Sequence, residues 1–182
     1  VTFGVPPIGA GSDEMARYRA IMRSAMLKQQ LQSAGVPDVT QVWSHEIGAS
    51  RMLIALAIKQ RYAGHAKQVG VLAASCGASV YGCKMVIVVD DDIDVSNLDQ
   101  LMWAMLSRYD PATSVDILRR MRSTPADPRL TPEQRKVRDF TNSRMVIDAT
   151  RPYEWRDKFP RVNAPSQEIV RKAREQFGYL LK

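Results

Sequence analysis

The sequence predicts an α/β fold: a mixed, mostly parallel sheet with flanking helices, preceded by an amphipathic linker helix and followed by an aromatic arm and a last helix. Three observations support this prediction. The run Met85–Val89 is continuously apolar and rich in β-branched residues, which is typical of a strand buried on both faces. Four carboxylates follow within Asp90–Asp94, and apolar residues then recur at helical spacing over Leu98–Leu106. Strand, acidic turn and helix form half of a βαβ unit.

The composition fits one globular domain with appendages. The chain has 182 residues, of which 45% are hydrophobic and 25% are charged. No stretch is long and apolar enough for a transmembrane helix and no signal segment opens the chain, so we expect no membrane association. Cys76 and Cys83 match no zinc spacing. This favours reduced thiols in a cytoplasmic protein over a disulfide.

The chain is basic, with a formal net charge of +7 and a pI near 9.6. Nucleic-acid binding is one interpretation. The densest groups, at 119–122 and 135–138, are not interleaved with aromatic residues, which favours a solvated face or an interface with an acidic partner. A surface covered by another part of the same polypeptide is a third interpretation.

The N-terminal part predicts an extended lead-in at 1–12 and then a helix. Ser12 or Asp13 is expected to cap this helix, which ends near Ala34 because Gly35 follows. We interpret its apolar stripe as a docking face packed as ordinary core; the stripe consists of Met15, Tyr18, Met22, Ala25, Met26 and Leu31. The predicted division of the chain is therefore a lead-in and linker helix at 1–34 and a domain at 35–182.

A hairpin is expected next, because strand-like segments at 39–46 and 52–58 flank the turn Ile47–Ser50. A helix then runs from about Ala66 to Ser75. Ser96 or Asn97 is expected to cap the helix that follows the central strand. The next predicted elements are a strand at 115–119, a Pro-rich loop at 123–132, a short polar helix or turn at 131–139 and a strand at 145–147. The chain then continues as an arm bearing Tyr153, Trp155 and Phe159 and ends in a helix that Ser166 caps and that reaches about Gly178. The three rings of the arm should lie on this domain or on a neighbouring subunit, since otherwise they form an exposed patch.

Two groups of residues are candidate sites. The carboxylates of Asp90–Asp94 could hold magnesium or calcium, but the segment lacks the glycine and distal glutamate of a calcium loop. Pairing with arginine or with backbone N–H groups explains them better. Lys59, Arg61 and His65 lie at a helix start and could bind a phosphate or carboxylate, the alternative being a surface basic turn.

The sequence contains no complete catalytic constellation. His45 and Glu46 are expected in a strand, where their side chains point to opposite faces and form no joint site. No phosphate loop, dinucleotide fingerprint or paired nucleophile and base is present.

A set of motifs runs through the chain in a characteristic order: Ile58–Ala66, Val88–Asp94, Trp103–Ala104, Ser107–Pro111, Thr124–Asp127, Asn142–Met145 and Asp148–Pro152. Together these segments resemble the UbiD-type prenylated-FMN-dependent decarboxylases, in the family's order and spacing from about Gly35 to the C-terminus. The sequence Arg151–Trp155 looks closer to the branches that act on aromatic acids. The chain therefore resembles the family's C-terminal domain, and the first residue, Val1, is compatible with processing or with a chain cut from a longer one.

The resemblance implies a reversible decarboxylation of an aromatic or α,β-unsaturated acid. It places the prenylated FMN, the manganese and potassium ions and the catalytic residues in an N-terminal flavin-binding domain, so no cofactor or catalytic residue is expected in this chain, which should be inactive alone. The C-terminal domain would form a homodimer or hexamer and close over the flavin.

The resemblance also assigns residues. The pocket-lining positions of the family fall on Thr124 and Ala126. A lysine that some relatives supply to the flavin phosphate falls near Ala78, which leaves Lys59, Arg61 and His65 as substitutes. Two other interpretations stay open: a stand-alone structural subunit that assembles with a separate flavin-binding chain, and an unrelated α/β domain that binds a nucleotide or an acidic ligand at the Asp90 cluster.

Overall fold

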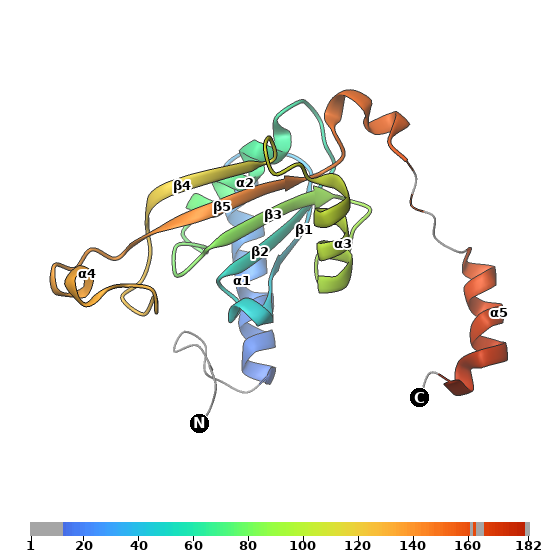
Figure 1. The fold of residues 1–182 in the computed structure, drawn as a ribbon, viewed down its shortest axis with the longest axis horizontal. Helices are drawn as coiled ribbons and strands as arrows, with labels where there is room; N and C mark the ends of the chain where they lie inside the picture. Colours follow the sequence, from blue (N-terminus) through green and yellow to red (C-terminus); the bar gives the residue numbers. More distant parts are fainter. Residues whose placement is uncertain (1–12, 161, 163–165, 181–182) are drawn as a thin grey trace.

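The computed structural model describes residues 13–160, 162 and 166–180, and shows a five-stranded sheet with helices on both faces (Figure 1). The predicted lead-in at 1–12, including the expected cap Ser12, lies outside the described residues. In chain order the elements are α1 (Asp13–Ser33), β1 (Val39–Ser44), η1 (Glu46–Gly48), β2 (Leu53–Ile58), α2 (His65–Ser75), β3 (Met85–Asp90), α3 (Leu98–Arg108), β4 (Val115–Arg122), α4 (Pro132–Lys136), β5 (Thr141–Ala149), η2 (Tyr153–Lys158), α5 (Gln167–Phe177) and η3 (Gly178–Leu180).

The sheet has the order β1-β2-β3-β5-β4 and confirms the predicted fold class. Strands β2, β3 and β5 run parallel in the middle, with Ile87 of β3 opposite Ala55 and Ile147. The two edge strands are antiparallel to their neighbours, and β1 and β2 form the predicted hairpin. The apolar run of β3 is buried on both faces because a strand on each side and a helical layer above and below cover it.

Two apolar cores lie on opposite faces of the sheet. Helices α1 and α2 cover one face, and α3 covers the other (Figure 1). Gly70 lets α2 approach the sheet closely, because a Cβ at this position would clash with Cγ1 of Val146. The cap of α3 is Asn97, whose side chain accepts from the Gln100 N–H, and Ser166 caps α5 in the same way, so both predicted caps are confirmed.

The face of α1 that packs on the sheet is not the predicted one. Its buried positions are Ala20, Ser24, Leu27 and Leu31. Of the predicted stripe only Leu31 is buried; Ala25 is exposed, and Met15, Tyr18, Met22 and Met26 are between 42% and 61% exposed. The prediction was wrong because it assigned the more apolar face of the helix to the core, whereas the opposite face packs on the sheet. The buried face hides a serine, which donates to the Ala20 carbonyl and accepts from the Ser44 N–H.

Three element boundaries also differ from those predicted. Strand β1 ends at Ser44, and His45 precedes a 3₁₀ turn, so His45 and Glu46 do not lie in a strand. Strand β4 extends to Arg122. Strand β5 begins at Thr141, well before the apolar residues that predicted it, because the strand accommodates a buried Arg144.

The C-terminal part divides into a docked and a free segment. In η2 the Tyr153 hydroxyl donates to the Arg61 carbonyl at 2.9 Å, so the start of the aromatic arm lies on its own domain, while Trp155 is 46% exposed. Helix α5 stands apart from the sheet, and its apolar side chains, including Ile169 and Phe177, are exposed (Figure 1). Among the described helices, none is both long and apolar enough to cross a bilayer.

Candidate functional site

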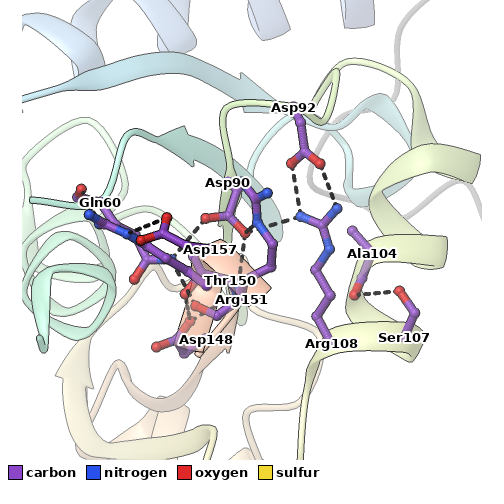
Figure 2. Close-up of polar contacts among 11 residues, drawn as sticks. Gln60, Asp90, Asp92, Ala104, Ser107, Arg108, Asp148, Thr150, Arg151 and Asp157 are labelled. Carbon is purple, nitrogen blue, oxygen red and sulfur yellow. Dashed lines mark hydrogen bonds and ion pairs between the residues drawn. The ribbon is translucent and has the colours of Figure 1, made fainter. Parts of the chain in front are cut away.

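The parallel strands give the domain two chemically different ends. At their carboxyl ends lies a cluster that we call the strand-end cluster, composed of Gln60, Asp90, Asp92, Arg108, Asp148, Thr150 and Arg151 (Figure 2). At their amino ends lies the segment Ser123–Leu130, which we call the amino-end loop. The two ends are separated by the length of β2, which has six residues and spans roughly 17 Å at about 3.3 Å per residue.

Asp90, the last residue of β3, is the centre of the strand-end cluster. Its Oδ2 accepts from Nη1 of Arg108 at 3.1 Å and from the backbone N–H of Arg151 at 2.7 Å. Its Oδ1 accepts from Nε2 of Gln60 at 2.8 Å, and the same amide donates to the Arg151 carbonyl. Asp90 thereby ties the end of β3 to Gln60 after β2, to Arg151 after β5 and to Arg108 at the end of α3 (Figure 2).

Arg108 pairs with a second carboxylate of the acidic turn. It donates to the two oxygens of Asp92 at 2.9 and 2.7 Å in a bidentate pair. These bonds hold the pKa of Asp92 below its usual value. The interpretation of the acidic turn as an arginine-paired hub is therefore confirmed. No group of three or more His, Cys, Asp or Glu among the described residues is arranged to hold a metal ion.

A cavity of about 530 Å³ lies beside this hub. It is lined by residues at or just after the ends of β2, α3 and β5 and by the residue before β4, among them Gln60, Arg108, Ser114, Asp148, Thr150 and Arg151. Oδ1 of Asp148 accepts from the backbone N–H of Thr150 at 3.0 Å and from its hydroxyl at 2.7 Å (Figure 2). Burial raises the pKa of Asp148, and the charges of Asp90 and Asp116 raise it further against the opposing hydrogen bonds.

We expect Asp148→Asn to stabilise the domain at pH 7, by on the order of 1 kcal/mol or less. A carboxyl with a raised folded pKa contributes full stability below its unfolded pKa and loses it as the pH rises through the folded pKa. Asparagine keeps the Oδ1 acceptor and cannot ionise, so the variant does not lose stability as the pH rises. Urea unfolding at pH 7 and pH 3.5 checks the prediction: the advantage should disappear at the lower pH. An equal difference at both values contradicts it.

The structure places Lys59, Arg61 and His65 at the carboxyl ends of the strands, where the side chains of Arg61 and His65 have local partners. His65 is buried; its Nδ1 accepts from the Arg61 N–H at 3.3 Å, and its Nε2 lies 3.1 Å from the Pro37 carbonyl. Burial lowers the pKa of His65. The Arg61 side chain pairs with Asp38. These three residues as flavin ligands stay a prediction.

Thr124 and Ala126 lie in the amino-end loop. The Thr124 hydroxyl accepts from the Ala126 N–H at 3.3 Å, and Thr124 is 5% exposed whereas Ala126 is exposed. The neighbouring Asp127 is buried and forms an ion pair with Lys84, the residue before β3. Burial opposes ionisation of Asp127, but the hydrogen bonds from Lys84, the Arg129 N–H and Asn142, together with the charge of Lys84, outweigh burial and lower the pKa of Asp127.

Arg144 connects this loop to the rest of the sheet. It is 1% exposed and donates to the carbonyls of Ala74, Val80 and Arg122, the last of which directly precedes the loop. Nδ2 of Asn142 donates to the Cys83 carbonyl and to the Ser123 hydroxyl, both at 3.0 Å. The loop that carries Thr124 and Ala126 is therefore held by buried polar contacts and not by apolar packing alone.

Comparison with known proteins decides the family. Residues 18–149 match the model of the 3-octaprenyl-4-hydroxybenzoate carboxy-lyase C-terminal domain, UbiD_C, which covers most of the chain. The chain belongs to the UbiD family. The resemblance seen in the sequence is thereby confirmed, and the interpretation as an unrelated α/β domain is excluded.

Relatives of this UbiD-family domain include two decarboxylases. The phenolic acid decarboxylase of Sedimentibacter hydroxybenzoicus is 32% identical over 148 residues, 80% of this chain and 28% of the relative. The gallate decarboxylase of Lactiplantibacillus plantarum is 27% identical over 157 residues, 82% of this chain and 31% of the relative. The chain thus spans less than a third of the length of these two relatives.

Solved structures of the same class share the fold. The UbiD-class enzyme HmfF from Pelotomaculum thermopropionicum, in complex with FMN, superposes with a TM-score of 0.71 at 28% identity, over 84% of this chain and 32% of that one. The vanillic acid decarboxylase of Sedimentibacter hydroxybenzoicus in open form gives 0.70 at 29% identity, over 93% of this chain and 35% of that one.

The sequence does not reveal the two buried arginines, Arg108 at the carboxyl ends of the strands and Arg144 near the amino ends, that stabilise these parts of the domain. In the sequence Arg108 belongs only to the segment Ser107–Pro111, and nothing in its spacing shows that it reaches two carboxylates, those of Asp90 and Asp92. Arg144 carries no local signal, because its acceptors are carbonyls distant in sequence. Cys76 and Cys83 are free thiols, as predicted.

Proposed function

We propose that this domain forms one wall of the active site of a prenylated-FMN-dependent enzyme that reversibly decarboxylates an aromatic or α,β-unsaturated acid. The observation that carries the proposal is the match of residues 18–149 to the UbiD C-terminal domain. The named functions of the relatives, phenolic acid and gallate decarboxylation, support an aromatic acid as the substrate.

The amino-end loop is the part of the chain that we place against the substrate. Thr124 and Ala126 have small side chains, so the wall they form leaves room for a substituted ring or for polar substituents. The loop is suited to this role because Lys84 and Arg135 hold it: Arg135 donates to the carbonyls of Pro125 and Asp127 at 2.6 and 2.9 Å. A fixed wall orients a ring and excludes water without taking part in the chemistry.

The cofactor would supply the reactive chemistry when bound. One structural relative, an evolved dimeric form of HmfF, was solved with prenylated FMN. We propose that the flavin, manganese and potassium are held by a flavin-binding domain, in the same chain or in a separate one, and that this domain meets the amino ends of the strands. Lys59, Arg61 and His65 follow β2 at the other end of the strands, roughly 17 Å from the amino ends by the length of β2. As flavin ligands they would therefore contact a part of the cofactor remote from Thr124.

A second role that we propose is self-association, as a homodimer or hexamer. Helix α5 supports it, because Ile169, Val170, Ala173 and Phe177 form an apolar stripe that no other described element covers. Light scattering on the purified chain measures its solution mass. A dimer or larger species is expected, and a monomer at high concentration contradicts the role. A cytoplasmic location, also proposed, agrees with the free thiols of Cys76 and Cys83.

An activity assay tests the proposed function. The chain is supplied with a flavin-binding domain of the family and prenylated FMN, and release of CO₂ from vanillic, gallic and cinnamic acids is followed. We expect turnover of at least one acid by the combination and none by the chain alone. Ala126→Phe should narrow the pocket and lower kcat/KM for the most substituted acid by about tenfold, which corresponds to roughly 1.4 kcal/mol of activation free energy.

The matched control lies in the same segment. Pro128→Ala changes an exposed residue of the amino-end loop that the family resemblance does not place in the pocket wall. It should leave the ranking of the acids unchanged. Turnover by the chain without any partner, or an equal effect of both substitutions, counts against the proposal.

A further inference from the structure

Three arginines near the amino ends of the strands have no carboxylate partner among the described residues. Arg19 and Arg23 lie one turn apart on α1, and Arg51 lies just before β2. All three are half-buried, and no ion pair within the described part of the chain includes any of them. We call them the arginine triad.

Two polar atoms of the triad are buried and unsatisfied. The Nε atoms of Arg23 and Arg51 are shielded from solvent and have no hydrogen-bond partner. Buried N–H groups almost always have an acceptor, so each missing one requires an explanation. Nη1 of Arg23 makes one long contact, to the Ala78 carbonyl at 3.4 Å.

The charges of the triad act on one another. Burial lowers the pKa of Arg23, and the charges of Arg51 and Arg19 lower it further; the pKa of Arg51 is lowered by burial and then by Arg19. Like charges held together without compensation destabilise a fold. A site that keeps them together is suited to an anion that is brought from outside.

The turn before β2 fixes the position of Arg51. Ala49 and Ser50, the two residues before it, both have left-handed backbones, with φ of 54° and 55°. The Ser50 hydroxyl donates to the Ala16 carbonyl of α1 at 2.7 Å, which ties the turn to the helix that carries the other two arginines. Strain of this kind persists where the surrounding structure enforces it, as at ligand sites.

We propose that the arginine triad binds a phosphate monoester. A guanidinium group matches the geometry of phosphate oxygens and donates two parallel hydrogen bonds. A phosphate monoester carries a charge between about −1.5 and −2 at pH 7, which balances three clustered cations better than one carboxylate does. Two sources have this chemistry: the phosphate of FMN, which rests on the proposed function, and a free phosphorylated metabolite, which does not.

Thermal unfolding of the full chain tests the triad. Inorganic phosphate, FMN and riboflavin are titrated at constant ionic strength, balanced with sodium chloride. Phosphate and FMN should raise the melting temperature, and riboflavin, which lacks the phosphate, should not. Arg51→Gln should weaken the apparent affinity for phosphate by about tenfold or more, as expected when a charge-assisted hydrogen bond is lost. Tighter binding of FMN than of inorganic phosphate identifies the flavin as the source; equal affinity favours a free metabolite.

The control is Arg17→Gln, an exposed arginine on the same helix, which should keep the full response to phosphate. Without phosphate, Arg51→Gln should be at least as stable as the native chain, because one repulsive charge is gone. Arg19→Gln provides a second variant with the same expectation. The inference is overturned if phosphate and FMN give no shift, or if the triad variants respond as Arg17→Gln does. Phosphate binding without decarboxylation would separate this result from the fate of the proposed function.

Discussion

Arg108→Met should lower the free energy of unfolding by about 3–5 kcal/mol, the range measured when one partner of a buried ion pair is removed. The Arg108 side chain is 1% exposed and Asp90 is 5% exposed, so the substitution leaves a buried carboxylate with less compensation. Arg151 and Gln60 still contact Asp90, which places the expected loss near the lower end of this range. Urea unfolding followed by circular dichroism measures it.

The pH dependence of this loss has a definite sign. Arg108 holds the pKa of Asp92 below its usual value, so the pair stabilises the domain at pH values above the unfolded-state pKa of aspartate, about 3.9. That contribution is lost as the pH falls through the lower folded pKa. The difference between native chain and variant should therefore shrink in acid. Lys67→Met is the control: it breaks an exposed pair with Asp116 and should cost less than about 1 kcal/mol. A similar cost for both substitutions contradicts the role of Arg108.

Arg144→Met should be comparably damaging, with a loss of about 3 kcal/mol or more. Arg144 has no carboxylate partner in the described structure; it satisfies the carbonyls of Ala74, Val80 and Arg122. Each buried acceptor left unpaired costs about 1–3 kcal/mol, and methionine can replace only the apolar stem. Urea unfolding again gives the size of the loss.

The effect of Arg144→Met should extend to the site. Because Arg122 directly precedes Ser123, the amino-end loop should exchange its amide hydrogens faster in the variant, while the strand-end cluster is less affected. Arg144→Lys keeps a donor that reaches fewer carbonyls, so it should fall between the native chain and Arg144→Met. A stable Arg144→Met domain with an unchanged loop would show that the arginine is dispensable.

The sequence predicts this fold best where one residue type decides the structure. The apolar, β-branched run of β3 favours a buried strand, and Asn97 and Ser166 cap their helices as their chemistry predicts. Helix α1 was misjudged because burial there depends on which of two apolar faces meets the sheet. The length of β5 was underestimated because Arg144, a residue that normally indicates a surface, is buried against carbonyls.

Some residues of the candidate site could be found from the sequence, and others only from the folded structure. Thr124 and Ala126 were reached through the family resemblance, which periodicity could not have supplied. The arginine triad combines two residues of α1 with one of a distant turn, and no sequence motif connects Arg23 with Arg51. What identifies the triad is a combination that cannot be read from spacing: two buried Nε atoms without acceptors, on Arg23 and Arg51, beside a third arginine, with no carboxylate partner among the described residues.

In the proposed enzyme the amino ends of the parallel strands face a flavin-binding partner, while the strand-end cluster holds the domain together. Hydrogen–deuterium exchange of the chain alone, and again with a flavin-binding domain and prenylated FMN, distinguishes the two ends. We predict slower exchange in the partnered state at 48–52 and in the amino-end loop, with little change at 59–65 and 91–96. Protection confined to 59–65 and 91–96, with an unchanged amino-end loop, would contradict the account.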